Sequence, residues 1–298
     1  MSVLYDVRHV TRFTYSAPVA LSHHRVHLTP RRTAWQTPVR TRLHTRPPGQ
    51  LTQWSTDYFG NAVAYLVIET AHRELTVEAH SRVRIEPRDL PDPAATAPWD
   101  TVAGRLAGDE AGFEALEFCY DSPATRAETD LLPFIASSFP PGRPVLAGGI
   151  DLCVRLHREF AYDGSATDVT TTVDEAFAGR RGVCQDFAHV ALACLRRLGL
   201  PARYVSGYLR TRRAEDTDGL RGADASHAWI ALFCPGHGWI DLDPTNDLLP
   251  DLEHVTVAWG RDYTDVSPVR GVAVGGGEHR VDVAVAVEAS GAETAVVE

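Results

Sequence analysis

The fold of this chain is decided by the stretch Arg181-Gly182-Val183-Cys184-Gln185-Asp186-Phe187-Ala188-His189. From Phe187 onward, apolar residues recur every three or four positions, which predicts a helix that ends before Gly199 and Pro201. Cys184 then falls in the first turn of this helix, where unpaired backbone N–H groups and the positive end of the helix dipole favour a thiolate. Cys184 is therefore a candidate nucleophile, the alternative being a small buried apolar residue.

Further along the chain, alternation predicts two strands, over residues 227–233 and 239–243, joined by a connection that contains proline and glycine. A hairpin with three loop residues sets His227 opposite Asp243, and one with five makes them diagonal neighbours. Either register brings the imidazole and the carboxylate onto one face. Asp241 shares that face and competes for the same role. We favour Asp243 because the proline after it ends the strand, which leaves this carboxylate at the end of the strand.

A thiol, an imidazole and a carboxylate in this order are the groups that cysteine-dependent acyl transfer requires. The N–H groups at the start of the helix can also stabilise an oxyanion beside the sulfur. A lone histidine is more often structural, and a lone aspartate is as often a cap or turn residue. The three together predict an active site.

Charge and periodicity divide the chain near residue 88. The first 88 residues hold 12 arginines and 6 acidic residues, whereas the rest holds 17 arginines and 33 acidic residues. Short alternating runs separated by turn signals predict an antiparallel, β-sandwich-like first domain. The predicted divisions are a β-rich domain over 1–88, a linker with helices over 89–149, a core over 150–260 and a C-terminal extension with one β-strand over 261–298.

The composition argues against several functional classes. The five cysteines form no C-x-x-C pair, the first residues do not resemble a signal peptide, and no apolar run approaches the length of a membrane span. We therefore expect a cytoplasmic protein without membrane attachment. The histidines and cysteines lack paired ligand spacing, so we expect neither a metal nor a cofactor. The scattered arginines of the first domain do not predict nucleic-acid binding.

Four motifs resemble those of the bacterial transglutaminase-like family, part of the superfamily with a papain-like core. They are Gly-Val-Cys-Gln-Asp-Phe-Ala-His at 182–189, Gly-Leu-Pro-Ala-Arg-Tyr-Val-Ser-Gly-Tyr at 199–208, Ser-His-Ala-Trp at 226–229 and Gly-Trp-Ile-Asp-Leu-Asp-Pro-Thr-Asn at 238–246. Residues 1–88 resemble the β-rich region that precedes this core in the family. The resemblance implies an α+β fold in which a helix bearing the cysteine packs on an antiparallel sheet bearing the histidine and the aspartate.

The resemblance also implies roles for the three residues. Cys184 is expected to be the nucleophile, His227 the general base and then acid, and Asp243 the group that orients His227. Weaker candidates for oxyanion or supporting roles are Tyr162, Gln185 and Asp186, of which Asp186, together with His189, more simply braces the helix.

We expect hydrolysis of a peptide, amide or isopeptide bond in a peptide or protein substrate. A true transglutaminase, in which an amine replaces water, and a non-catalytic protein-binding module are the alternatives. Family association suggests a pathway partner that resembles ATP-grasp proteins. We expect the loops 163–182 and 211–225 to line the substrate pocket. The turn at 215–219 faintly resembles a calcium loop but lacks its ligand spacing.

Overall fold

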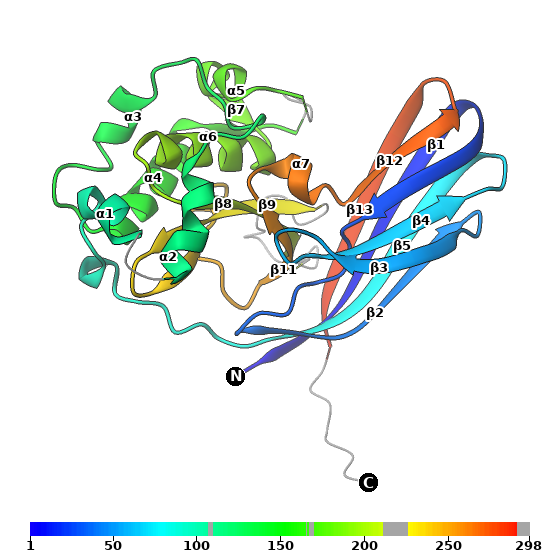
Figure 1. Ribbon diagram of the computed structural model, residues 1–298, viewed down its shortest axis with the longest axis horizontal. Coiled ribbons are helices and arrows are strands. Elements are labelled where there is room, and N and C mark those ends of the chain that lie inside the picture. The colour runs from blue at the N-terminus through cyan, green and yellow to red at the C-terminus, as the bar shows by residue number, and fades with distance from the viewer. Residues whose placement is uncertain (107–109, 165, 167–169, 211–225, 291–298) are drawn as a thin grey trace, which may run out of the picture.

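The computed structural model has two parts, a long antiparallel sheet and a helical part built around a smaller sheet (Figure 1). This mixed arrangement with mostly antiparallel sheets confirms the predicted α+β fold class. The structure describes residues 1–106, 110–164, 166, 170–210 and 226–290. The predicted calcium-like turn at 215–219 and the expected pocket loop over 211–225 lie outside this range, as does part of the loop 163–182.

The large sheet contains seven strands, each antiparallel to its neighbours. They are β1 (Val3–Val26), β2 (Gln36–Arg46), β3 (Gln50–Thr56), β4 (Ala62–Ile68), β5 (His72–Ile85), β12 (Val269–Gly275) and β13 (His279–Ser290). β1 is central: β5 and then β4 pair along one side of it, and β13 and then β12 along the other. β2 and β3 complete the sheet by pairing with β5 and β4.

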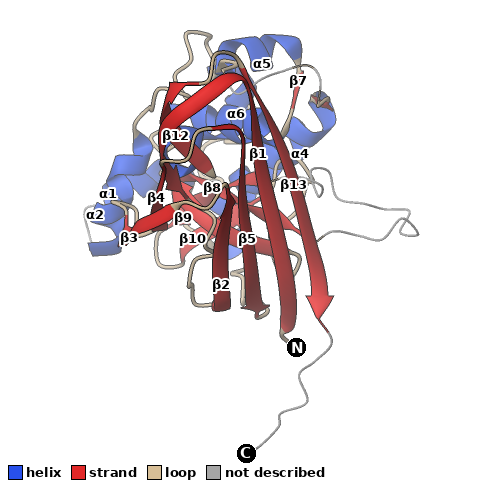
Figure 2. Ribbon diagram, turned by 90° about the vertical axis from the view of Figure 1, so that its right-hand side faces the viewer, coloured by secondary structure: helices blue, strands red, loops and turns tan. Residues whose placement is uncertain are grey.

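The sheet bends where the pairing along β1 is interrupted, between Thr14 and Val19. At the same level the partner of β1 changes from β5 to β4 on one side and from β13 to β12 on the other. The sheet turns over at its upper end (Figure 2). Buried side chains from both sides of the bend, among them Val19, Leu66 and Leu75, then meet in one core. The expected sandwich-like domain is thus one continuous sheet folded over itself.

β12 and β13 come from the segment that we expected to form a C-terminal extension. The strand predicted within residues 261–298 is present as β13, and it pairs with β1 from Leu4↔Ser290 to Tyr15↔His279. The last strands of the chain therefore complete the sheet that the first strand begins.

The smaller sheet has the order β10-β9-β8-β11. Its strands are β8 (Ala202–Leu209), β9 (His227–Cys234), β10 (Gly238–Leu242) and β11 (His254–Gly260). Two short parallel strands, β6 (Ala161–Tyr162) and β7 (Arg181–Gly182), lie beside the central helix. The helices are α1 (Val102–Leu106), α2 (Glu110–Ala115), α3 (Leu132–Ala136), α4 (Val145–Glu159), α5 (Val173–Gly179), α6 (Cys184–Arg197) and α7 (Tyr263–Val266).

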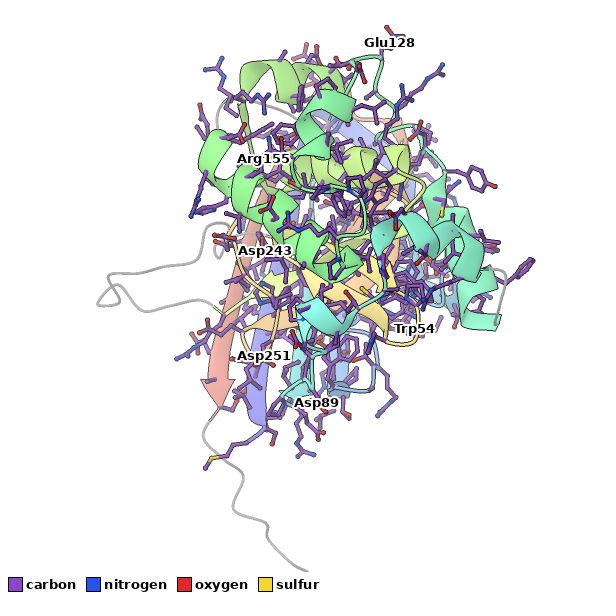
Figure 3. All side chains as sticks on the ribbon, turned by 90° about the vertical axis from the view of Figure 1, so that its left-hand side faces the viewer. Trp54, Asp89, Glu128, Arg155, Asp243 and Asp251 are labelled. Atoms are coloured by element: carbon purple, nitrogen blue, oxygen red, sulfur yellow. The ribbon has the colours of Figure 1, made fainter. Side chains whose placement is uncertain are left out.

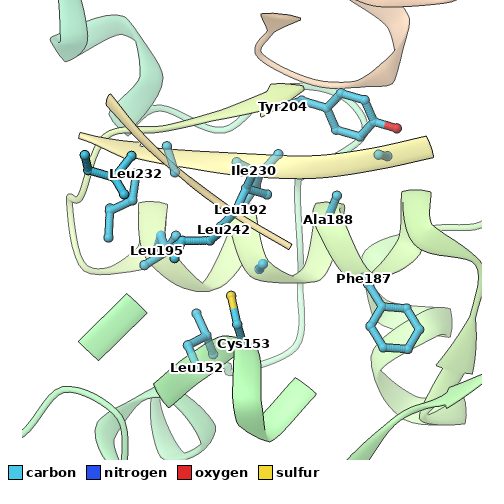
Figure 4. Packing of buried hydrophobic residues seen from close by; sticks show 14 of the residues in the cluster. Leu152, Cys153, Phe187, Ala188, Leu192, Leu195, Tyr204, Ile230, Leu232 and Leu242 are labelled. Atoms are coloured by element: carbon cyan, nitrogen blue, oxygen red, sulfur yellow. The ribbon is translucent and has the colours of Figure 1, made fainter. Parts of the chain in front are cut away.

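Helix α6 forms the centre of the helical part. Every residue from Cys184 to Arg196 is buried, because one side of the helix contacts the sheet and the other contacts α4. Figure 4 shows Leu192 and Leu195 between the strands above and the α4 residues Leu152 and Cys153 below. Phe134, Phe160 and Phe177 extend this core toward α3 and α5. The first turn of α6 is consequently held rigidly within the molecule.

Two side-chain amides join the large sheet to the edge strand β11. Gln36 donates to the carbonyl of Thr256 (2.7 Å) and accepts from its N–H (2.8 Å). Asn61 does the same with the carbonyl (2.8 Å) and the N–H (2.9 Å) of Trp259. Each amide thus satisfies the backbone groups that an edge strand otherwise leaves unpaired. The two parts are fixed to one another at β11.

Within the described residues, no helix is both long enough and apolar enough to cross a lipid bilayer.

The packing of α4 can be tested at two helical glycines. A Cβ added at Gly148 would lie 2.3 Å from a ring carbon of Phe139, whereas one added at Gly104 would meet nothing within 4 Å. We expect Gly148→Ala to lower the unfolding free energy by about 1–3 kcal/mol through overpacking. Gly104→Ala should leave it unchanged or raise it by up to about 1 kcal/mol, since alanine favours helix. Urea denaturation of both variants measures this; equal effects would contradict the close packing at Gly148.

Candidate active site

Cys184 is the first residue of α6, as the sequence predicts. Val183 before it is extended (φ −98°, ψ 178°), and its N–H donates to the Asp186 carboxylate at 2.8 Å. Asp186 therefore takes the place of a capping side chain, and its charge suits the positive end of the helix dipole. Gly182 has to be a glycine here, because a Cβ would lie 2.4 Å from an Asp186 oxygen. This local geometry brings the Cys184 thiol to the start of the helix, where it is 8% exposed.

His227 begins β9 and lies beside Gly207 of β8. In the hairpin that follows, Trp239 pairs with Phe233, which is the register that we associated with five loop residues. His227 and Asp243 are therefore diagonal neighbours. Their side chains meet, with Nε2 of His227 donating to Oδ2 of Asp243 at 2.8 Å. The sequence prediction that these two residues contact one another agrees with the structure.

The Asp243 carboxylate is fully buried and accepts hydrogen bonds from several groups. Oδ2 accepts from His227, from Asn246 Nδ2 (2.8 Å) and from His254 Nε2 (3.2 Å). Oδ1 accepts from the backbone N–H groups of Thr245 (2.9 Å) and Asn246 (3.2 Å). Five donors surround one carboxylate, so its charge and its orientation are both fixed.

Sequence reasoning missed His254 and Asn246 as partners of Asp243. Asn246 belongs to the quoted motif and lies three residues after Asp243, so the sequence indicated an Asx-type turn that brings the two residues together. His254 begins β11, the strand beyond β8, and no local pattern links it to Asp243. Its side chain also packs edge-on against the buried ring of Trp229, with 5.2 Å between ring centres.

Asp241, the competing carboxylate, has a different partner. It forms a buried salt bridge with Arg88, at 2.7 Å between Nη1 and Oδ2. The Arg88 guanidinium also lies over the ring of Trp35 at 4.1 Å. The backbone N–H of Arg88 donates to Asp251, and Figure 3 shows Asp251 and Asp89 on the same side of the molecule. Asp241 thus anchors the segment that leaves the large sheet, while Asp243 is left to His227.

The electrostatics favour a charged imidazole next to the thiol. Burial opposes the charged form of His227, but the Asp243 carboxylate and the Cys184 sulfur outweigh it and raise the pKa of His227 to about 10. Burial also opposes the charge of Asp243, yet His227 and His254 hold the pKa of this carboxyl far below its usual range. His254 has its pKa lowered, chiefly by burial, and therefore acts as a neutral donor. The positive charge is concentrated on His227.

The thiol and the imidazole are electrostatically coupled. The sulfur of Cys184 is one of the groups that raise the pKa of His227. The sulfur also lies 4.0 Å from the carbonyl oxygen of Ser226. Nε2 of His227 is engaged by Asp243, and within the described chain Nδ1 has no hydrogen-bond partner. Nδ1 is therefore the ring nitrogen that can exchange a proton with the sulfur.

The supporting candidates lie near the start of α6. Tyr162 pairs with Gly182 across the short parallel strands, two residues before the cysteine. Gln185 is buried in the first turn of α6. His189, one turn on, accepts a hydrogen bond from the Tyr263 N–H at 3.3 Å, and burial lowers the pKa of His189 to about 4. His189 thus fastens α6 to α7, in agreement with a bracing role.

One group of side chains has the composition of a metal site. The ligand atoms of His227, Asp243 and His254 lie within 4.8 Å of one another, and all three residues are buried. The two imidazoles already donate to the same carboxylate oxygen, so an ion there would have to replace both hydrogen bonds. The observed contacts assign this group to orientation of the imidazole.

The raised pKa of His227 predicts a pH dependence of stability. Its ordinary value is 6.5, so between pH 6.5 and about 10 the folded chain binds more protons than the unfolded chain. Stability from this group is complete below pH 6.5 and is lost as the pH rises toward 10. The measurement is made in Cys184→Ala, because in the wild type a proton that moves from the thiol to the imidazole leaves the total number of protons bound by the folded chain unchanged. In Cys184→Ala, Asp243 still raises the pKa of His227 but the sulfur no longer does, so we expect the unfolding free energy to fall between pH 7 and 9 by at most about 1.4 kcal/mol per pH unit relative to Cys184→Ala/His227→Gln. Parallel curves in urea denaturation would contradict the charged imidazole.

Comparison with known proteins is consistent with this geometry. Residues 5–84 match the bacterial transglutaminase-like N-terminal region, and residues 149–244 match the transglutaminase-like superfamily. An uncharacterized protein of Mycobacterium tuberculosis is 39% identical over 294 residues, which cover 95% of this chain and 92% of that protein. A protein-glutamine gamma-glutamyltransferase of Pseudomonas aeruginosa is 34% identical over 99 residues, 32% of this chain and 15% of that protein.

The fold is also found in a solved structure, that of a candidate cysteine protease from Cytophaga hutchinsonii. It superimposes with a TM-score of 0.77 at 19% identity, covering 99% of this chain and 93% of that one, so the shared fold extends over the large sheet as well as the helical part. The two matched regions and the mycobacterial relative show that this chain belongs to the bacterial transglutaminase-like family.

Proposed function

We propose that this protein catalyses cysteine-dependent acyl transfer, with hydrolysis of a peptide, amide or isopeptide bond as the reaction. The observation that carries the proposal is the coupling of the Cys184 thiol, at a helix N-terminus, to an imidazole that a buried carboxylate holds. Each part has a chemical purpose: the helix and the imidazolium favour the thiolate, and the carboxylate favours the imidazolium. The superfamily match supports an enzyme of this class.

The reaction would proceed in two balanced steps. His227 takes the thiol proton through Nδ1, the sulfur of Cys184 forms a bond to the carbonyl carbon, and the carbon–nitrogen bond breaks as His227 returns the proton to the leaving amine. Water then loses a proton to His227 and attacks the thioester, which releases the acid and restores the thiol. Asp243 keeps the imidazole in the required orientation throughout. Backbone N–H groups at the start of α6, with Tyr162 and Gln185 as candidates beside them, would stabilise the oxyanion.

Amine transfer is the second candidate, since part of the chain is similar to a protein named as a gamma-glutamyltransferase. It differs only in the acceptor that attacks the thioester. All 29 basic residues counted as lysine or arginine are arginines, so the chain offers no lysine side chain as an acceptor. Any amine therefore has to come from another molecule or from the chain's own N-terminus.

We also propose that the substrate is a peptide or a protein and that the enzyme is cytoplasmic. The described cysteines are all free thiols, which suits a reducing compartment. A partner resembling ATP-grasp proteins would place the reaction in a pathway of peptide modification. A non-catalytic binding module is the alternative that the following two experiments address.

The first experiment measures thiol reactivity. Cys119 is more exposed than Cys184, but burial raises the pKa of Cys119 to about 11. We expect iodoacetamide at pH 7 to modify Cys184 well before Cys119, as read from mass-mapped adducts. Asp243→Asn should slow the modification of Cys184 by about tenfold or more, because it lowers the pKa of His227. Asp241→Asn, the matched control, should lower thermal stability and keep the rate within about twofold. Faster labelling of Cys119 would contradict an activated Cys184.

The second experiment separates water from amine as the acceptor. Peptide and glutamine-amide libraries are incubated with the protein, with and without an added primary amine, and the products are identified by mass. We expect the acid to remain the main product when the amine is present. Amine incorporation that exceeds hydrolysis would instead assign a transglutaminase. Cys184→Ala should abolish both products; full turnover by this variant would remove the entire proposal, and intact trapping of an acyl group on Cys184 would support it.

A further inference from the structure

The face of the smaller sheet that lies away from α6 carries a stack of alternating arginines and tryptophans. The guanidinium of Arg31 lies 3.5 Å from the ring centre of Trp259, and that of Arg203 lies 3.6 Å from the same ring. Arg203 also lies 4.4 Å from the ring of Trp239. The Arg203 guanidinium therefore lies against two indole rings, which leaves its N–H edge as the part that can bind another group.

Arg203 lacks the partner that a buried charge normally has. It is 5% exposed, and within the described residues its side chain makes no hydrogen bond or salt bridge. Other buried arginines of this protein are paired. Arg196 donates to backbone carbonyls and to two hydroxyls, including Thr125 Oγ1 at 2.8 Å, and Arg88 forms its salt bridge with Asp241. An unpaired buried guanidinium is costly, so Arg203 calls for an explanation other than stability.

Arg203 faces a cavity of about 760 Å³ between the two parts of the molecule. Aromatic side chains from four separate segments form its walls, and two acidic residues of the segment that contains α2 also line it. The lining comprises Arg31, Tyr58, Phe59, Gly60, Phe113, Glu114, Leu116, Glu117, Phe118, Tyr120, Arg203, Trp239 and Trp259. The rings of Trp239, Phe118 and Phe59 follow one another with centre separations of 5.1 and 5.9 Å. The cavity thus combines an apolar aromatic wall with an unpaired guanidinium.

The charge of Arg203 persists at neutral pH. Burial lowers its pKa to about 9, with Asp241 acting in the opposite direction. Asp241 is bound to Arg88, so the guanidinium edge is free for an anion from outside. The second arginine of the stack is partly engaged, because Arg31 donates to the carbonyl of Phe59 and to Asn61.

We propose that this cavity binds a carboxylate carried on an apolar or aromatic body. The edge of a guanidinium offers two parallel N–H groups that fit the two oxygens of one carboxylate. The aromatic walls would cover the body of the ligand. A phosphate dianion fits less well, since Glu114 and Glu117 face the same space and would repel the additional charge.

The cavity is separate from the site that contains Cys184. Arg203 pairs with Ala231, and Gly207 pairs with His227 on the same two strands. Gly207 lies four positions after Arg203, which corresponds to about 13 Å along the strand. The buried pair Val205↔Trp229 lies between them. Ligand binding at Arg203 therefore does not depend on the proposed acyl transfer, and it can be measured without turnover.

The test uses N-acetyl-phenylalanine and its neutral analogue N-acetyl-phenylalaninamide, with binding to the full chain measured by calorimetry and by tryptophan fluorescence. We expect the acid to bind and the amide to bind at least about tenfold more weakly, because only the acid carries a carboxylate for the guanidinium. Equal binding of the two would overturn the proposal. This comparison needs no variant, so it does not depend on whether a substituted chain folds.

Two variants locate the site. Arg203→Met should weaken binding of the acid by about tenfold or more without lowering the thermal midpoint, because it removes an unpaired buried charge. Arg12→Met, at an exposed arginine of β1, is the matched control and should bind as the wild type does. Full binding by Arg203→Met would overturn the proposal.

A last comparison separates this site from the active site and identifies the source of the carboxylate. Modification of Cys184 with iodoacetamide should leave binding unchanged, whereas loss of binding would place the ligand at the active site and overturn the proposal. A tripeptide that ends in phenylalanine should bind more tightly than the small acid if the natural ligand is a peptide terminus. It should bind no more tightly if that ligand is a free acid; both results would support a carboxylate site.

Discussion

The buried Asp243 carboxylate is the group on which the site depends. It receives hydrogen bonds from His227, His254, Asn246 and the backbone of the turn after β10, so it ties three strands and a loop to one point. A carboxylate at this depth is tolerable only because its lone pairs are satisfied. The same bonds that stabilise the buried charge also fix the imidazole, whose pKa the thiol at the start of α6 helps to raise.

The two acidic residues of β10 are separated by one position and have different tasks. Asp241 pairs with Arg88 and so holds the segment between the two parts of the molecule, while Asp243 pairs with His227. Gln36 and Asn61 join the same two parts at the opposite edge of the smaller sheet, on β11. The large sheet therefore holds the smaller one from both edges, and the space left between them becomes the cavity of Arg203.

Much of this arrangement could be predicted from sequence because it is local. The apolar repeat after Phe187 placed Cys184 at a helix start, and strand parity put His227 and Asp243 on one face. Parity could not choose between Asp243 and Asp241, since that choice rests on Arg88, which lies 153 positions before Asp241. His254 and the pairing of β13 with β1 were missed for the same reason. Both depend on contacts between distant segments, which short-range periodicity does not encode.

The pairing of β1 with β12 and β13 has a consequence for the order of assembly. β1 is synthesised first, but the strands along one of its sides are translated only after the whole helical part. Until then a long strand edge is exposed on the ribosome, with nothing of its own chain to cover it. Helix α6 can pack in the meantime, because its contacts with α4, α5, β8 and β9 all lie within residues 145–234. The large sheet is therefore completed last, when the final strands β12 and β13 pair with the first strand β1.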